Sequence, residues 1–371
     1  MPLDLSVWIV AISLLAVGLI AGFFMHRSDF CFVGAFRDLL LFRSFHRFGS
    51  LILAITVAAT LIEMARLLGW LQPYPFSWYG TPSMVNVFGG FLFGIGMVFA
   101  GGCVVGVLYK FGGGSVLAGV AIVGLLVGSG IYAEFHPAWI QVAKALQLHD
   151  HATTLPQLID IGPFWPIILF IGLGGYVSLY LRRQGKQELM GQPDGYIPLW
   201  ISAVVLAFLG LATIMITGLP MGVTTTYAKT AAWIETLAFP EHVAGLTFFN
   251  AKAVSLSLPT LTREMSGNAG AQWDVVALLQ APLIVGIVGG AMLSAALLGE
   301  LKFFWKLPLR QVVMVFCGGV IMALGSRMTP GCNLWHLLGG VPILAAQSLL
   351  FVLGLFPGTW LGGIMLKRIL I

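Results

Sequence analysis

Three of the four cysteines are the residues of this chain best placed to contact a ligand. Cys103 and Cys332 each follow a glycine, Gly102 and Gly331, and Cys31 lies between two phenylalanines. The four cysteines form no CxxC pair and show neither a zinc-site nor a thioredoxin-like spacing. A thiol is a weak hydrogen-bond donor and acceptor with a polarizable sulfur. These positions therefore indicate either weak contact with a soft ligand atom or covalent sulfur chemistry.

Each Gly-Cys pair stands where a long apolar segment ends and a short one begins. Proline and glycine break the preceding helix and allow a tight turn, as at Pro330 and Gly331. A helix that begins there presents free N–H groups and the positive end of its dipole, which bind anions readily. Asn333 lies at such a start and could donate a hydrogen bond or cap the helix. Cys317 lies within a long apolar segment, where we expect it to pack in the protein interior.

The composition places these residues in a membrane protein. Of 371 residues, 58% are hydrophobic and only 9% are charged, and the mean hydropathy is +0.96. Soluble domains carry about 25% charged residues. A soluble fold, a disordered chain, a disulfide scaffold and a nucleic-acid binder are therefore excluded. The net charge of +5 is expected to orient the chain in the bilayer.

Hydropathy predicts an all-α integral membrane protein. A bilayer core takes about 20 apolar residues in a helix. Nine such segments lie near 6–25, 48–70, 84–101, 115–135, 163–182, 198–217, 276–298, 310–328 and 343–366. Segments that are too short to cross, as expected of re-entrant half-helices, lie near 28–43, 102–112, 221–237 and 331–340. The polar stretches 136–162 and 238–275 are expected to form loops on the outer side.

The distribution of positive charge predicts the orientation. With the N-terminus outside, thirteen of the 19 lysines and arginines fall on the inner side, and the C-terminus lies inside as well. This agrees with the rule that cytoplasmic loops are the basic ones. The outer side keeps Arg66, Lys144, Lys229, Lys252, Arg263 and Arg327.

Four cations close to the cysteines in sequence could attract an anion to one mouth of a path. Arg27 and Arg37 flank the first cysteine, and Lys110 follows the second by seven residues. An equally good explanation of these three is that they only set the orientation. Arg327 precedes the last cysteine by five residues and falls on the outer side, where positive charge is the exception, so a functional role is favoured.

An internal repeat relates two of the cysteine segments. Residues 89–103 read GGFLFGIGMVFAGGC and residues 318–332 read GGVIMALGSRMTPGC. At an offset of 229 residues, a glycine pair, a single glycine and the final Gly-Cys coincide. The copies stand on the third and eighth predicted spans and so run in opposite directions, as in many secondary transporters. We expect one domain over 1–371, with halves of about 1–135 and 198–371 and a linking helix near 163–182.

Three motifs together resemble the YeeE/YedE family of bacterial inner-membrane proteins over essentially the whole chain. They are HRSDFCFVGAFRD (26–38), GIGMVFAGGCVVGVLYKFGGG (94–114) and MTPGCNLWHLLGG (328–340). The resemblance implies uptake of thiosulfate or a related sulfur anion across the inner membrane, through nine spanning and four short helices. It also implies that Cys31, Cys103 and Cys332 line the path. The charge rule then puts the N-terminus in the periplasm and the C-terminus in the cytoplasm.

The resemblance leaves several functions open. Some relatives are linked to selenium compounds, and others work beside a TusA-like sulfur carrier, which is a candidate cytoplasmic partner here. A membrane thiol oxidoreductase or sulfurtransferase, and a transporter of another small anion, are the alternatives. We expect a transporter rather than an enzyme, with no cofactor, metal or nucleic-acid partner. The expected path residues are Cys31, Cys103, Cys332, Gly102, Gly331 and Asn333.

Overall fold

The computed structural model describes residues 5–71, 79–186, 194–251, 254–257 and 264–370. Within these ranges, nine helical segments are long and apolar enough to cross a bilayer, in agreement with the hydropathy prediction. Their long helices are α1 (Leu5–Ser28), α3 (His46–Leu67), α4 (Val85–Phe99), α6 (Val116–Ala145), α8 (Phe164–Arg183), α9 (Leu199–Thr217), α13 (Val275–Leu297), α14 (Leu309–Met328) and α16 (Ala346–Leu370).

Short helices occupy the four segments that are too short to span. Three of them are regular, namely α2 (Phe32–Phe42), α5 (Val104–Gly112) and α10 (Thr224–Ala238). The fourth begins as α15 (Asn333–Trp335), continues as the π-helical turn η1 (His336–Gly340) and ends in the 3-10 turn η2 (Val341–Ile343). The π-helical turn η1 is the unusual part, because π-helical turns are rare and occur mostly at functional sites.

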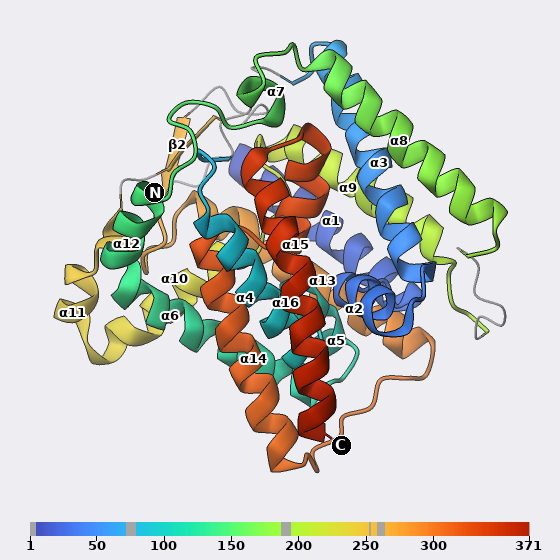
Figure 1. The fold of residues 1–371 in the computed structure, drawn as a ribbon. Coiled ribbons are helices and arrows are strands. Elements are labelled where there is room, and N and C mark those ends of the chain that lie inside the picture. The colour runs from blue at the N-terminus through green and yellow to red at the C-terminus, as the bar shows by residue number, and fades with distance from the viewer. Residues whose placement is uncertain (1–4, 72–78, 187–193, 252–253, 258–263, 371) are drawn as a thin grey trace.

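The order of the elements is the same before and after α8. With the short connecting elements between residues 146–163 and 239–274 left aside, it runs long, short, long, long, short, long in each part. The packing pairs also correspond, since α4 packs on α16 as α14 packs on α6, and α1 packs on α13 as α9 packs on α3. The helices α4 and α14 pack on each other. Figure 1 shows α4, α14 and α16 side by side and α8 at the edge of the molecule, beside α3.

Glycines bring the backbones of these helices into direct contact. A Cβ atom added to Gly90 would lie 2.1 Å from the carbonyl oxygen of Phe351 in α16. One added to Gly96 would lie 2.4 Å from the backbone nitrogen of Met322 in α14. Small residues at helix interfaces are how membrane helices approach closely, because lipid supplies no hydrophobic drive between them. The glycine pattern of the repeat therefore explains how α4 packs against both of its neighbours.

Two features outside the long helices differ from the sequence prediction. The helix α6 continues to Ala145, ten residues past its predicted end, because hydropathy reports apolarity while the polar stretch after Pro137 still forms helix. The strands β1 (Val254–Ser257) and β2 (Glu264–Gly267) form an antiparallel pair within the second predicted loop, so the described chain is not wholly helical. The outer cations predicted at Lys252 and Arg263 lie outside the described residues.

The remaining described elements are short helices between the long ones. They are α7 (Leu155–Leu158), α11 (Pro240–Gly245) and α12 (Thr247–Asn250). In Figure 1, α11 and α12 lie beside α6 and α10, away from α8. They lie in the polar stretches where the sequence predicts loops.

The contact at Gly96 predicts a stability effect. Gly96→Ala should lower the free energy of unfolding by about 1–3 kcal/mol, because the added methyl group overpacks a backbone contact that cannot move. Gly172→Ala in α8 is the matched control, since nothing lies within 4 Å of a Cβ atom there. Thermal unfolding in detergent measures both variants. Equal melting temperatures for the two would contradict the proposed packing of α4 on α14.

Candidate functional site

Three buried cysteines stand directly before three of the short helices. Cys31 is the N-cap residue of α2, Cys103 of α5 and Cys332 of α15, and all three have extended backbone angles. The Gly34 N–H donates a hydrogen bond to Sγ of Cys31 at 3.4 Å, and the Gly106 N–H donates to Sγ of Cys103 at the same distance. The thiols thus lie at helix ends that carry unpaired N–H groups and positive dipole charge.

The fourth short helix begins at the third thiol. No capping hydrogen bond joins Cys332 to its own helix. Its thiol lies near the backbone of Leu334 and Trp335 and also near that of Val223, the residue before α10. The starts of α15 and α10 therefore both lie near this sulfur atom.

The three thiols lie in the same buried core. They belong to the main hydrophobic core, and none is in a disulfide. Cys103 lies within electrostatic range of both Cys31 and Cys332. The structure thus brings together cysteines that are separated by 72 and 229 positions in the sequence.

Two glycines allow the tight turns at these sulfur atoms. Gly331 has a φ of +143°, and a Cβ atom on it would lie 2.6 Å from Cδ1 of Trp335. A Cβ atom on Gly102 would lie 3.0 Å from the backbone nitrogen of Val107. At both predicted path glycines, each next to a cysteine, a side chain would therefore collide with neighbouring atoms.

Buried polar atoms near Cys332 lack hydrogen-bond partners. The side chain of Arg327 is 8% exposed and lies near Tyr132 and Cys332, and its Nε atom has no partner in the described chain. The amide nitrogen of Asn333 donates to Sδ of Met97 at 3.4 Å, and its Oδ1 atom has no partner among the residues that the structure describes. A buried cation without a counter-charge is costly. An anion at this place would offset that cost.

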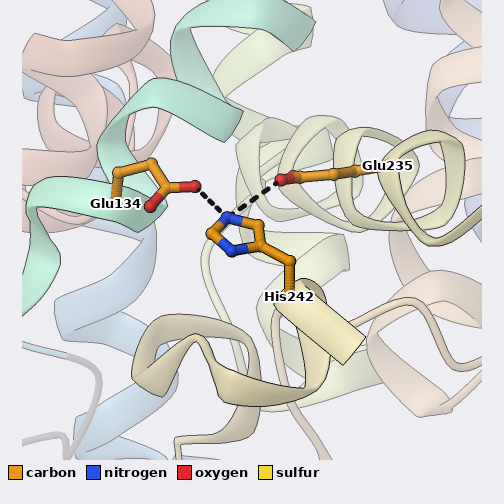
Figure 2. A group of neighbouring side chains, drawn as sticks. All are labelled: Glu134, Glu235 and His242. Carbon is orange, nitrogen blue, oxygen red and sulfur yellow. Dashed lines mark hydrogen bonds and ion pairs between the residues drawn. The ribbon is translucent and has the colours of Figure 1, made fainter. Parts of the chain in front are cut away.

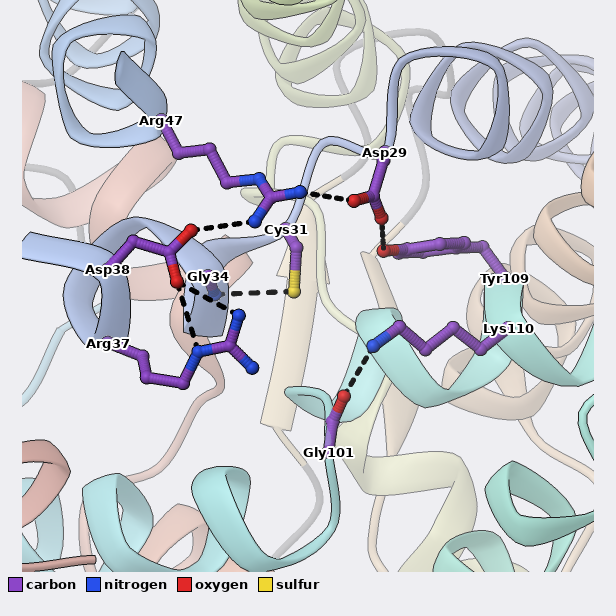
Figure 3. Close-up of polar contacts among 9 residues, drawn as sticks. All are labelled: Asp29, Cys31, Gly34, Arg37, Asp38, Arg47, Gly101, Tyr109 and Lys110. Atoms are coloured by element: carbon purple, nitrogen blue, oxygen red, sulfur yellow. Dashed lines mark hydrogen bonds and ion pairs between the residues drawn. The ribbon is translucent and has the colours of Figure 1, made fainter. Parts of the chain in front are cut away.

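The charges beside Cys31 are mutually paired, as Figure 3 shows. Arg47 of α3 joins Asp38 at 2.7 Å and also forms an ion pair with Asp29, while Arg37 pairs with Asp38 at 2.9 Å. Among the cations considered as anion attractors, Arg37 is therefore already neutralised by a carboxylate. These ion pairs tie α2 to the end of α1 and to the start of α3.

The other two inner cations are bound differently. The Lys110 ammonium group donates a hydrogen bond to the Gly101 carbonyl oxygen, just before the turn at Cys103 (Figure 3). The guanidinium of Arg27 lies 5.9 Å from the ring centre of Phe23, and its Nη1 atom is buried without a hydrogen-bond partner in the described residues. Neither is paired with a carboxylate among these residues.

Sequence reasoning missed the carboxylates Asp29 and Asp38. The usable signal is that two acidic residues stand in one short apolar segment of a chain that has only 14 acidic residues.

The sequence analysis also expected Cys317 to be buried, whereas this thiol is exposed on α14. The reason is that the face of α14 beside it, with Gly318 and Met322, packs on α4, so Cys317 points away from the protein.

A hollow lies next to the start of α10. The side-chain oxygen of Gln280 accepts hydrogen bonds from the N–H and the hydroxyl of Thr226, at 3.0 and 3.2 Å, so its amide nitrogen is left for other partners. The lining residues are Leu14, Thr213, Thr217, Leu219, Pro220, Gly222, Val276, Leu279, Gln280, Leu283 and Trp335. The lining thus includes Gly222, next to Val223 in the chain, and Trp335 of α15, but not Cys332 itself.

A second polar cluster joins the ends of three helices, away from the thiols. His242 of α11 lies with its Nε2 atom 2.5 Å from Glu134 of α6 and 3.6 Å from Glu235 of α10 (Figure 2). Their ligand atoms lie within 4.8 Å of one another, so these three are the described side chains that could hold a metal ion. The hydrogen bond from His242 to Glu134 raises the pKa of the imidazole above its ordinary value of 6.5.

This shift predicts a pH-dependent stability. Because the pKa of His242 is raised in the folded state, the contribution is complete below about pH 6.5 and is lost as the pH rises through the raised value. The melting temperature of the wild type should therefore fall more between pH 6 and pH 8 than that of His242→Gln. Parallel melting curves across this range for the two proteins would show that the ion pair contributes nothing.

The fold and these sites define a class of protein. A bundle of span-length helices that encloses helix ends and small polar groups is the construction of a polytopic membrane transporter. The family model described as sulphur transport matches residues 27–361, and the chain belongs to this family.

Two relatives named thiosulfate transporter TsuA match along nearly their whole length. The one from Spirochaeta thermophila is 28% identical over 369 residues, which cover 94% of this chain and 97% of the relative. The one from Escherichia coli is 24% identical over 355 residues, which cover 94% and 93%. A probable transporter YedE from Salmonella typhimurium is 33% identical over 160 residues, which cover 43% of this chain and 35% of the relative. The chain is thus a membrane transporter for a sulfur compound.

Proposed function

We propose that this chain takes up thiosulfate, or a closely related sulfur anion, across a bacterial inner membrane. The path runs past the thiols of Cys31, Cys103 and Cys332. The observation that carries the proposal is that short helices begin at these three buried thiols, in a family with relatives named thiosulfate transporters. A path of this kind attracts an anion without a full positive charge at every step.

The chemistry of the path suits the two ends of this anion. Thiosulfate has a soft terminal sulfur and hard oxygens. A neutral thiol touches the soft end through its polarizable sulfur, and helix N–H groups bind the oxygens. Gly102 and Gly331 keep the backbone close to the passing ion, and Asn333 adds an amide. Weak contacts in series allow release as well as entry.

The two halves of the chain, about 1–135 and 198–371, form an inverted repeat joined by the helix near 163–182. The matching order of the elements and the corresponding packing pairs support this interpretation. The four short helices are then re-entrant, two from each face, and their starts meet near the middle of the bilayer. The N-terminus faces the periplasm and the C-terminus the cytoplasm, in accordance with the positive-inside rule.

Charged groups attract the anion at the two mouths of the path. Arg327, buried and without a paired carboxylate in the described chain, receives it on the outer side. Lys110 and Arg27 lie on the inner side, with Arg37 held against Asp38.

Inward movement of a dianion against a potential that is negative inside costs about 4.6 kcal/mol per 100 mV. Uptake therefore needs a coupling ion, a steep gradient or prompt consumption inside, for which a TusA-like carrier is a suitable partner.

This proposal predicts the loss of transport on removal of either central thiol. Cys103→Ala and Cys332→Ala should each reduce the uptake of labelled thiosulfate into proteoliposomes at least tenfold, because each removes a contact that no neighbour replaces. Cys317→Ala is the matched control, since that thiol is exposed on α14, and its uptake should equal that of the wild type.

Retained uptake in both central variants would contradict the role of the thiols. Competition by sulfate, sulfite and selenium analogues would show which anion the path prefers.

Measurement of the intact protein mass after exposure to thiosulfate tests the sulfurtransferase alternative. A lasting added sulfur atom on the protein would favour covalent chemistry over passage.

A further inference from the structure

The hydroxyl of Tyr227 is buried in the protein without a hydrogen-bond partner. Its side chain is 5% exposed and belongs to the same core cluster as the three thiols. Its Oη atom has no partner among the described residues. A buried hydroxyl in that condition has lost its hydration and gained nothing in return, so such groups are rare unless a ligand or an ordered water completes them.

The place of Tyr227 is fixed by the start of α10. It stands four residues after Val223, so the two lie on the same face of the chain where the helix begins. The backbone of Val223 lies near the thiol of Cys332. The phenol group is within electrostatic range of Cys332 and also of Cys103. The buried hydroxyl is therefore within electrostatic range of two thiols that come from opposite halves of the chain.

The other buried tyrosines are satisfied. In the described part of the chain, Tyr79 donates to the Trp335 carbonyl oxygen at 2.8 Å, and Tyr109 donates to Asp29 at 3.4 Å. The hydroxyl of Tyr132 lies 3.3 Å from His136. Tyr227 alone among these four carries a donor that the protein leaves unused beside the path.

We propose that the Tyr227 hydroxyl donates a hydrogen bond to the oxygen end of the anion as it passes between Cys332 and Cys103. This inference rests on the proposed function and adds a residue that determines specificity. The thiols contact the soft sulfur, and the phenol group contacts a hard oxygen. A neutral donor of this kind orients the dianion without holding it as a cation would.

Tyr227→Phe tests the proposal, because it removes the oxygen atom and keeps the ring. In proteoliposomes, the thiosulfate concentration for half-maximal uptake should rise about tenfold, as for the loss of one hydrogen bond to a charged group. Competition by sulfate should weaken as well, because sulfate offers oxygens alone. Tyr79→Phe is the matched control, since it removes a buried hydroxyl that already has a partner.

Thermal unfolding separates this role from a structural one. Without ligand, Tyr227→Phe should melt at or above the wild-type temperature, since it removes an unsatisfied group, whereas Tyr79→Phe should melt lower. Added thiosulfate should stabilise Tyr227→Phe less than the wild type.

Several outcomes would overturn the inference. One is an unchanged half-saturating concentration in Tyr227→Phe while the wild type transports thiosulfate, and this result leaves the proposed function standing. Another is a variant that melts as low as Tyr79→Phe or cannot be purified, because the hydroxyl would then have a structural partner. If the wild type moved no thiosulfate, the proposed function would fail first and this inference with it.

Discussion

The structure depends on the burial of helix ends that lack hydrogen-bond partners in their own helices. A helix start leaves N–H groups unpaired, and at membrane depth no bulk water is present to satisfy them. In this chain the side chains of Cys31 and Cys103 cap the starts of α2 and α5, whereas Cys332 stands before α15 without a capping hydrogen bond and lies near the start of α10. Sulfur is a weak acceptor, so these ends remain only partly satisfied, and the proposed function assigns the remaining capacity to an anion.

The surrounding architecture keeps the helix ends close together. Glycines such as Gly90 and Gly96 remove the side chains that would separate α4 from α16 and α14. Ion pairs from Arg47 to Asp29 and Asp38 fix α2 against its neighbours. Close packing and paired charges therefore carry the stability, and the centre is left with weak donors. Under the proposed function, this division lets a closely packed protein hold its anion through weak contacts.

Much of the fold could be predicted from the sequence, because hydropathy follows directly from bilayer thickness. The nine spans and four short segments lie where apolarity and glycine place them. The same signal does not report helix beyond the apolar region, which is why the end of α6 and the strands β1 and β2 were missed. Hydropathy also does not report which face of a helix points to the protein interior, so Cys317 was expected inside although it faces outward.

Of the proposed site, the sequence predicts only the local backbone features. Gly102 and Gly331 mark turns that require glycine, and the cysteines that follow them take the N-cap positions. Tyr227 could not be found in the same way, because its proposed role rests on an unpaired hydroxyl, and pairing depends on the neighbours that folding brings. The network around Arg47 is similar, since its partners are Asp29, just after α1, and Asp38 of α2.

A structure with a bound selenium analogue of thiosulfate, with selenium at the terminal position, tests the central claim most directly. Anomalous scattering locates the selenium atom independently of the protein. The account predicts a peak in contact with the sulfur atoms of Cys103 and Cys332, with the oxygens directed to the starts of the short helices. A fully occupied peak elsewhere, with none beside these two thiols, would contradict it.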